Sequence, residues 1–378
     1  MWYNDLRPDS ELINDRYSLI MLDEDNDYTR EMTDNDKERT IEKILELKRG
    51  LLKEIPPKTV DRNLLLASWN IKNFGKILQR SAESLYYIAE IINAFDIVSI
   101  QEINSDTADF KKVVRLLGSN WKYTLSDVTE GKSGNDERFG FIYDSNRVNQ
   151  TGLSGELVVP PDDIADNPLI RQLKRTPTLT GFESGWTKFS IVSVHLHPGD
   201  DDDDQALRKE EVRLLLDLLR EKKEALPVEY RNVIILGDTN LYKDDTDIVQ
   251  LFSDDHFFEC GSLKGKFTNT SLNQVYDRIF LNVHNFFNLA KDENDNDRGG
   301  VFNLFKYVYQ DTEDEIAKYH DFMRNHKANN SNLTSPAAFK DYFNKYWKRN
   351  QMSDHLPVWI EILTDSSESF LSFKKNRF

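Results

Sequence analysis

From Asn63 onward, short apolar runs with β-forming side chains alternate with a few segments of helical spacing. Leu85, Ile88, Ala89 and Ile92 form one face of a predicted helix, and a second helix is expected over 205–223 with Asp204 as its N-cap. The predicted strands are LLLASWNI (64–71), DIVSIQEI (96–103), RFGFIYDS (138–145), GELVV (155–159), PTLTGFE (177–183), KFSIVSVHL (188–196), NVIILGDTN (232–240), YDRIFLN (276–282) and PVWIEI (357–362). Many strands with few intervening helices predict two packed sheets with helices outside.

The alternation of predicted strands and helices is interrupted at both ends of the chain and once within it. Residues 1–60 are predicted to be an N-terminal extension with one amphipathic helix, which Pro56 and Pro57 end. Residues 283–352 form a predicted insertion between the last two strands, with an aromatic-rich stretch at 300–310 and Asn-rich loops around 328–335. The predicted catalytic domain spans 61–365, and 366–378 form a C-terminal tail.

Composition narrows the class of protein. The 378 residues are 39% hydrophobic and 30% charged, which is typical of a globular chain. The sequence contains one cysteine, Cys260, and no signal-peptide pattern, so we expect a cytoplasmic protein without an intramolecular disulfide. The net charge of −16 argues against a protein that coats nucleic acid nonspecifically. It does not exclude an enzyme that meets phosphate in a local site.

Polar side chains with catalytic potential lie at or beside the ends of the apolar strands. Such positions allow a sheet scaffold to bring side chains from different strands into one cleft. They are Asn70, Glu102, His195, Asp238, Asn240, Asp277, Asp354 and His355.

These residue types suit phosphodiester hydrolysis. Carboxylate and amide oxygens are the ligands that Mg²⁺ prefers, and such a cation neutralises charge on phosphoryl oxygens. His195 and His355 can activate water or protonate a leaving group, provided that a carboxylate orients each ring. The sequence contains neither a P-loop nor a Gly-x-Ser-x-Gly elbow, so an NTPase of that type and a serine hydrolase are disfavoured.

The ordered motifs resemble those of the endonuclease/exonuclease/phosphatase superfamily, and in particular those of its deoxyribonuclease I-like members from bacteria. The resemblance covers roughly residues 63–363. It implies an α/β four-layer sandwich of two packed, mostly antiparallel β-sheets flanked by helices. The matching segments are SWNIKNFG (68–75), SIQEI (99–103), ERFGFIY (137–143), IVSVHLHP (191–198), ILGDTN (235–240), YDRI (276–279) and SDHLPV (353–358).

The resemblance also implies a metal site. Glu102 would bind the catalytic Mg²⁺ or Mn²⁺, with Asn70 nearby on the metal or the phosphate. Asp238 and Asn240 would orient water, phosphate and metal. Asp354 would lie beside them as a further metal residue.

Acid and base roles are implied for two histidines. His195 would act on the leaving group and be held by Glu137. His355 would activate water or bind the phosphate and be held by Asp277. Asp238 is a rival base, and the sequence leaves the two assignments open.

Three further positions are interpreted in the same way. Arg175 matches a phosphate-binding arginine of the family, and Tyr143 is expected to line the same cleft. His197 shares the alternation phase of His195 and is interpreted as structural. The Asp run at 200–204 is interpreted as a solvated loop that leads into a helix, because it lacks the spaced ligands of a calcium loop.

The leading hypothesis is a metal-dependent endonuclease that cuts DNA with little sequence preference. One alternative is a phosphatase or phospholipase of the same superfamily, acting on inositol phosphates or sphingomyelin, since a fold does not fix the substrate. Another is a latent nuclease whose active site is gated by the N-terminal extension, the insertion or a partner. A regulatory protein or a second copy of the chain is the expected protein partner. No membrane association is expected.

Overall fold

The computed structural model describes residues 1–12, 32–75, 80–128, 137–167, 169–170, 172–225, 231–284, 286–326 and 332–377. Parts of the acidic N-terminal segment and of the Asn-rich loops around 328–335 lie outside these residues. In the described ranges, no helix is both long and apolar enough to cross a bilayer.

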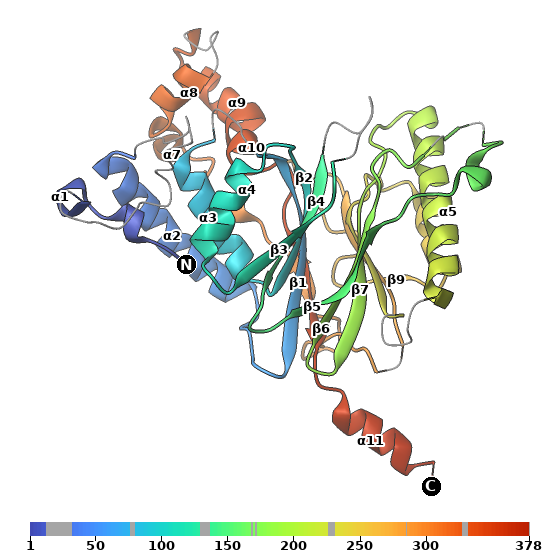
Figure 1. The fold of residues 1–378 in the computed structure, drawn as a ribbon. Helices are drawn as coiled ribbons and strands as arrows, with labels where there is room; N and C mark the ends of the chain where they lie inside the picture. Colours follow the sequence, from blue (N-terminus) through green and yellow to red (C-terminus); the bar gives the residue numbers. More distant parts are fainter. Residues whose placement is uncertain are drawn as a thin grey trace.

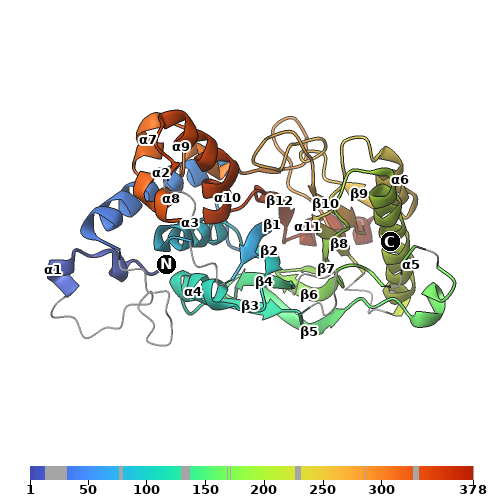
Figure 2. The same cartoon turned by 90° about the horizontal axis from the view of Figure 1, so that it is seen from above.

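Two β-sheets pack face to face and are covered on their outer faces by helices (Figures 1 and 2). The first six-stranded sheet has the spatial order β11 (Gly299–Val301), β12 (Val358–Leu363), β1 (Asn63–Phe74), β2 (Ile97–Ile103), β4 (Arg138–Asp144) and β3 (Trp121–Leu125). The second has the order β5 (Asn149–Glu156), β6 (Thr178–Ser184), β7 (Thr187–His195), β8 (Val233–Asp238), β10 (Asp277–Asn282) and β9 (Phe258–Glu259).

The strand directions confirm the predicted fold class. All neighbouring strands are antiparallel except β1 with β2 and β7 with β8, which are parallel. The two parallel pairs occupy the middle of their sheets, so each sheet directs two adjacent carboxyl ends toward the same edge.

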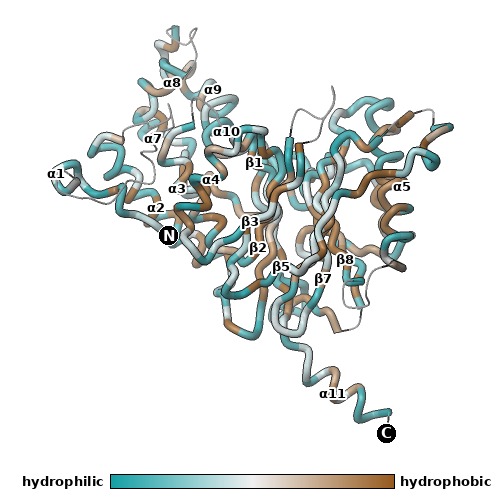
Figure 3. Tube along the Cα trace, viewed as in Figure 1, coloured by the Kyte–Doolittle hydropathy of each residue, from teal (hydrophilic) through white to brown (hydrophobic). Residues whose placement is uncertain are grey.

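Burial on both faces explains the unbroken apolar runs of the central strands. In β1, Leu64 and Leu66 face the second sheet, whereas Leu65 and Ala67 face the helices. The hydropathy of the trace follows this layering, with the apolar segments concentrated in the strands and the helix faces beside them (Figure 3).

The outer layers are built from helices that lie far apart in the sequence. α5 and α6 cover the second sheet, while α2, α3, α4 and the helices of the insertion lie on the side of the first (Figure 2). The helices are η1 (Asn4–Leu6), α1 (Asp9–Leu12), α2 (Asp34–Glu54), α3 (Ala82–Asn93), α4 (Ala108–Leu117), η2 (Pro161–Ile164), α5 (Asp202–Ala225), α6 (Thr246–Asp254), η4 (Leu304–Lys306), α7 (Glu313–Ala317), α8 (His320–His326), α9 (Pro336–Tyr342), η6 (Phe343–Trp347), α10 (Lys348–Gln351) and α11 (Ser367–Lys375). α11 extends away from the sandwich (Figure 1).

The N-terminal extension and the insertion pack against each other. α2 starts with a capping box between Thr33 and Asp36. Its Lys43 lies 3.3 Å from Glu315 of the insertion. Gly50 allows the close approach, because a Cβ there would meet the Tyr307 ring at 2.4 Å. The two segments therefore build one helical layer.

Several predicted boundaries are wrong. α5 begins at Asp202, and the Asp201 side chain accepts the Asp204 N–H at 2.8 Å, so Asp201 caps a helix whose first turn contains the predicted cap. The predicted strand at 155–159 is displaced, because β5 runs from Asn149 to Glu156 with largely exposed residues that hide the alternation.

Candidate active site

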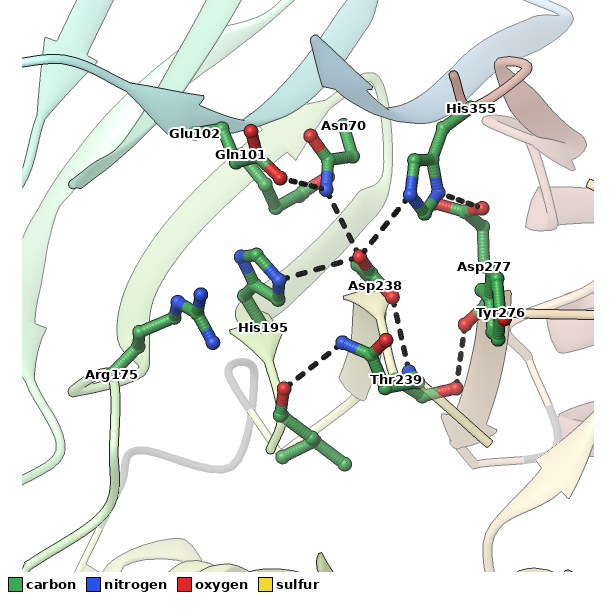
Figure 4. Close-up of polar contacts among 12 residues, drawn as sticks. Asn70, Gln101, Glu102, Arg175, His195, Asp238, Thr239, Tyr276, Asp277 and His355 are labelled. Carbon is green, nitrogen blue, oxygen red and sulfur yellow. Dashed lines mark hydrogen bonds and ion pairs between the residues drawn. The ribbon is translucent and has the colours of Figure 1, made fainter. Parts of the chain in front are cut away.

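The polar strand ends predicted from the sequence converge at one edge of the sandwich (Figure 4). β1 and β2 bring Asn70 and Glu102 from the first sheet, and β7 and β8 bring His195 and Asp238 from the second. His195 and Asp238 are register partners in the parallel pair, so the topology itself places them side by side.

Asp238 lies at the centre of this cluster. Its Oδ2 accepts a hydrogen bond from Asn70 Nδ2 at 2.9 Å. The same oxygen lies 3.4 Å from His195 Nε2 and 3.6 Å from His355 Nε2. Asp238 is 2% exposed, so one buried carboxylate faces two imidazoles and one amide.

Each histidine has a second carboxylate behind it. His355 Nδ1 lies 2.8 Å from Asp277 Oδ2, and because a carboxylate only accepts, this nitrogen carries the proton. His195 Nδ1 lies 3.2 Å from Glu137 Oε2, at ion-pair distance but without the alignment of a hydrogen bond. The structure thus brings together both pairs that the resemblance implies.

The electrostatics follow from this arrangement. Burial lowers the pKa of His355, but Asp277 and Asp238 outweigh it and hold that pKa well above its usual value. Burial raises the pKa of Glu137, yet His195 and Arg175 bring it down to about 2. Glu137 is therefore ionised at neutral pH.

Glu102 reaches the cluster through an unusual backbone conformation. Its φ is +60°, in the left-handed region that a non-glycine residue seldom adopts, and it falls where the β2–β4 register shifts. Its carboxylate accepts hydrogen bonds from Asn70 Nδ2 at 2.9 Å and from the Asn73 N–H at 3.0 Å. Backbone strain at this position is typical of functional sites.

The donor set fits a hard divalent cation. Asn70 Nδ2 donates to two carboxylates, which fixes the amide orientation and leaves the buried Oδ1 without a hydrogen-bond partner. An unsatisfied buried oxygen, on the amide that bonds Glu102 and Asp238, is an acceptor that a cation would satisfy. Among the described residues no group of three His, Cys, Asp or Glu side chains already forms a metal cage. Mg²⁺ commonly uses one or two carboxylates and keeps several waters.

Asp354 lies on the same edge but is paired with a residue that sequence reasoning missed. Lys72 Nζ lies 3.1 Å from Asp354 Oδ2. Burial raises the pKa of Asp354, but His355 and Lys72 lower it below its usual value. Lys72 belongs to the SWNIKNFG motif, two residues after Asn70, so its place in the sequence could have predicted that it lies near the site.

Ser353 is a second missed residue. Its fully buried hydroxyl donates to the Asn70 carbonyl at 2.6 Å and accepts the N–H groups of Lys72 at 3.2 Å and His355 at 3.0 Å. One hydroxyl therefore fixes the end of β1 against the segment that carries Asp354 and His355.

Arg175 and Asn240 complete the cluster. Arg175 Nε donates to Glu137 Oε2 at 2.8 Å, and its buried Nη1 has no hydrogen-bond partner, which leaves a donor for a phosphate oxygen. Asn240 has a φ of +46° and donates from its backbone N–H to Asp238 Oδ1 at 3.0 Å. Its side chain donates to the Leu196 carbonyl, so it orients Asp238 and the end of β7.

One predicted site residue lies elsewhere. Tyr143 pairs with Ile97 at the start of β2, whereas Glu102 lies near the other end of that strand. Its ring packs between the two sheets and its hydroxyl reaches Gln150. The expectation that Tyr143 lines the cleft is wrong, because β4 runs antiparallel to β2 and carries only its Glu137 end to the site. His197 pairs with Asp204 at 2.8 Å, away from the cluster.

Comparison with known proteins agrees with this geometry. No protein-family model matches the chain. Deoxyribonuclease-1 of Bos taurus is 25% identical over 232 residues, which cover 58% of this chain and 77% of that protein. The mannosyl-6-phosphatase Bt3783 of Bacteroides thetaiotaomicron has a TM-score of 0.50 at 16% identity, over 79% of this chain and 99% of the other. These comparisons support the resemblance to the endonuclease/exonuclease/phosphatase superfamily, and to deoxyribonuclease I in particular.

A further solved structure has a similar fold. An endonuclease/exonuclease/phosphatase family protein from Bacteroides thetaiotaomicron is also similar in fold, with a TM-score of 0.49 at 16% identity over 80% of this chain and 95% of the other. The relatives are hydrolytic enzymes, and members of the superfamily generally use divalent metals.

Proposed function

We propose that this protein is a divalent-metal-dependent endonuclease that hydrolyses DNA with little sequence preference. The observation that carries the proposal is the pair of carboxylate-backed histidines facing Asp238. Phosphodiester hydrolysis needs one group to take a proton from water and another to give one to the leaving oxygen. Two histidines on either side of one carboxylate supply both.

The roles of the residues follow from their contacts. Asp277 holds His355 in one tautomer, and Asp238 stabilises the charged ring. Glu137 lies behind His195, at ion-pair distance from its Nδ1, while the Nε2 of the same ring faces Asp238. Either histidine can act as the base, with Asp238 as a rival, and rate measurements on single variants decide between them.

Asn70, Glu102 and Asp354 would hold the cation, with Asp238 beside them. The cation would supply positive charge to the phosphoryl oxygens as negative charge develops there. Arg175 provides a second positive charge, through its unpartnered Nη1, for a non-bridging oxygen. Glu137 keeps this guanidinium in place through hydrogen bonds to Nε and Nη2.

DNA is favoured over a small phosphate ester because the sequence relative is a deoxyribonuclease. Contacts to phosphates rather than to bases would give the low sequence preference.

The test is nicking of supercoiled plasmid by the purified protein with Mg²⁺ or Mn²⁺, against EDTA. We expect His195→Ala to lower the rate by about 10²–10⁴-fold, the usual contribution of a general acid or base. His197→Ala is the matched control, since His197 lies two residues away but pairs with Asp204 outside the cluster. Metal-independent nicking, or equal losses in both variants, would count against the proposal. Phosphate release from monoesters without nicking would favour a phosphatase.

A further inference from the structure

We infer that Arg349, in the last helical turn of the insertion, binds a phosphate of the nucleic acid strand beside the scissile one. The inference rests on the proposed nuclease function and assigns a substrate contact to a segment that has no other role in the mechanism. It also gives the insertion a task that its sequence does not reveal.

The position of Arg349 is set by its contacts. α10 ends at Gln351, two residues before Ser353. The Arg349 guanidinium donates from Nη2 to Ser271 Oγ at 3.0 Å. Ser271 follows Thr270, whose N–H donates to the Asp354 carbonyl at 2.9 Å. The Arg349 side chain therefore contacts the loop whose backbone is hydrogen-bonded to Asp354, a candidate metal ligand.

Arg349 differs from nearby cations in its charge balance. Lys72 is paired with Asp354, and Lys345 on the neighbouring turn is paired with Asp341 at 2.8 Å. Arg349 forms no ion pair with any carboxylate in the described part of the chain, and its buried Nε has no hydrogen-bond partner. A half-buried guanidinium whose charge is not balanced by a carboxylate is suited to bind a phosphate.

The charge of the whole protein makes such a local contact necessary. The net charge is −16, and the exposed residues Asp200 to Asp203 follow the strand end that carries His195. A phosphate backbone is repelled by this acidic segment and by the protein as a whole. Affinity for DNA must therefore come from a few cations near the site that no carboxylate neutralises. Arg349, beside the loop that contacts Asp354, is one of them.

The experiment measures binding of a fluorescein-labelled duplex oligonucleotide in EDTA, where hydrolysis does not interfere, between 50 and 200 mM NaCl. One lost phosphate contact lowers the slope of log affinity against log salt by about 0.9. We expect this change in Arg349→Gln, so that its affinity falls about 3.5-fold less than that of the wild type over the same range. Arg349→Lys, which keeps the charge, should restore most of the slope.

Lys345→Gln is the matched control, because it removes one exposed positive charge from the same helical segment and should keep the wild-type slope. An unchanged slope in Arg349→Gln, with binding and nicking by the wild type intact, would overturn this inference alone. Equal slope changes in Arg349→Gln and Lys345→Gln would also overturn it, since bulk charge would then explain both. A wild type that neither binds nor nicks DNA would overturn the proposed function together with it.

Discussion

Glu137 should contribute strongly to stability at neutral pH and progressively less in acid. Its side chain is 10% exposed and lies 2.8 Å from Arg175 Nε and 3.2 Å from His195 Nδ1. Burial alone would raise its pKa, but these two partners lower it from the usual 4.5 to about 2. The change Glu137→Gln keeps the shape of the side chain and removes its charge.

The size of the effect follows from the pKa difference between the folded and unfolded chains. A shift of this size corresponds to about 3 kcal/mol that favours folding when the carboxyl is ionised. Because the folded-state pKa is the lower one, this contribution is complete above the unfolded pKa and is lost as pH falls through the folded pKa. About 1 kcal/mol should be gone by pH 4 and about 2 kcal/mol by pH 3.

Urea unfolding of wild type and Glu137→Gln from pH 7 down to pH 3.5 tests this reasoning. We expect Glu137→Gln to be less stable by about 3 kcal/mol at pH 7, because Arg175 loses its buried partner, and the gap to narrow with falling pH. Asp127→Asn is the control for removal of a charge, since Asp127 is exposed and its Oδ1 lies as far as 3.8 Å from Arg138 Nη1. A gap that stays constant with pH, or one below about 1 kcal/mol at pH 7, would refute the electrostatic account.

Three further changes probe the cluster. Asn70→Ala removes the buried Oδ1 and should raise the Mg²⁺ concentration for half-maximal nicking by about 10–100-fold, whereas unchanged Mg²⁺ dependence would remove Asn70 from the metal site. Asp277→Asn frees the wrong tautomer of His355 and should lower kcat by about 10²–10⁴-fold with little change in KM; a loss confined to KM would contradict an orienting role. Ser353→Ala leaves two part-buried N–H donors without an acceptor and should cost about 1–3 kcal/mol in urea unfolding; a neutral variant would show that water replaces the hydroxyl.

The fold was predictable where local pattern and burial agree. The central strands β1 and β8 are apolar on both faces, so their sequences are unmistakable. The edge strands were not predictable in the same way. β3 has exposed positions at Lys122 and Tyr123, and β9 and β11 are only two and three residues long, which is too short for periodicity to be visible.

The cluster was predictable because a strand end is a local feature, whereas its supports depend on contacts between distant segments. Glu102 and Asp238 stand out within a few residues of sequence, but the tie between Ser353 and Asn70 joins positions 283 residues apart. The prediction for Tyr143 was wrong for a different reason. A motif indicates that a strand reaches the site, but it does not indicate which end of the strand does so. Long-range ties of this kind also join the extension to the insertion. The Glu83 carboxylate of α3 pairs with Arg39 of α2 at 2.9 Å and accepts the Tyr309 hydroxyl at 3.1 Å. The segments that look dispensable in the sequence thus support the helix layer behind the catalytic edge, and the chain that leaves this layer through α10 leads directly to Ser353.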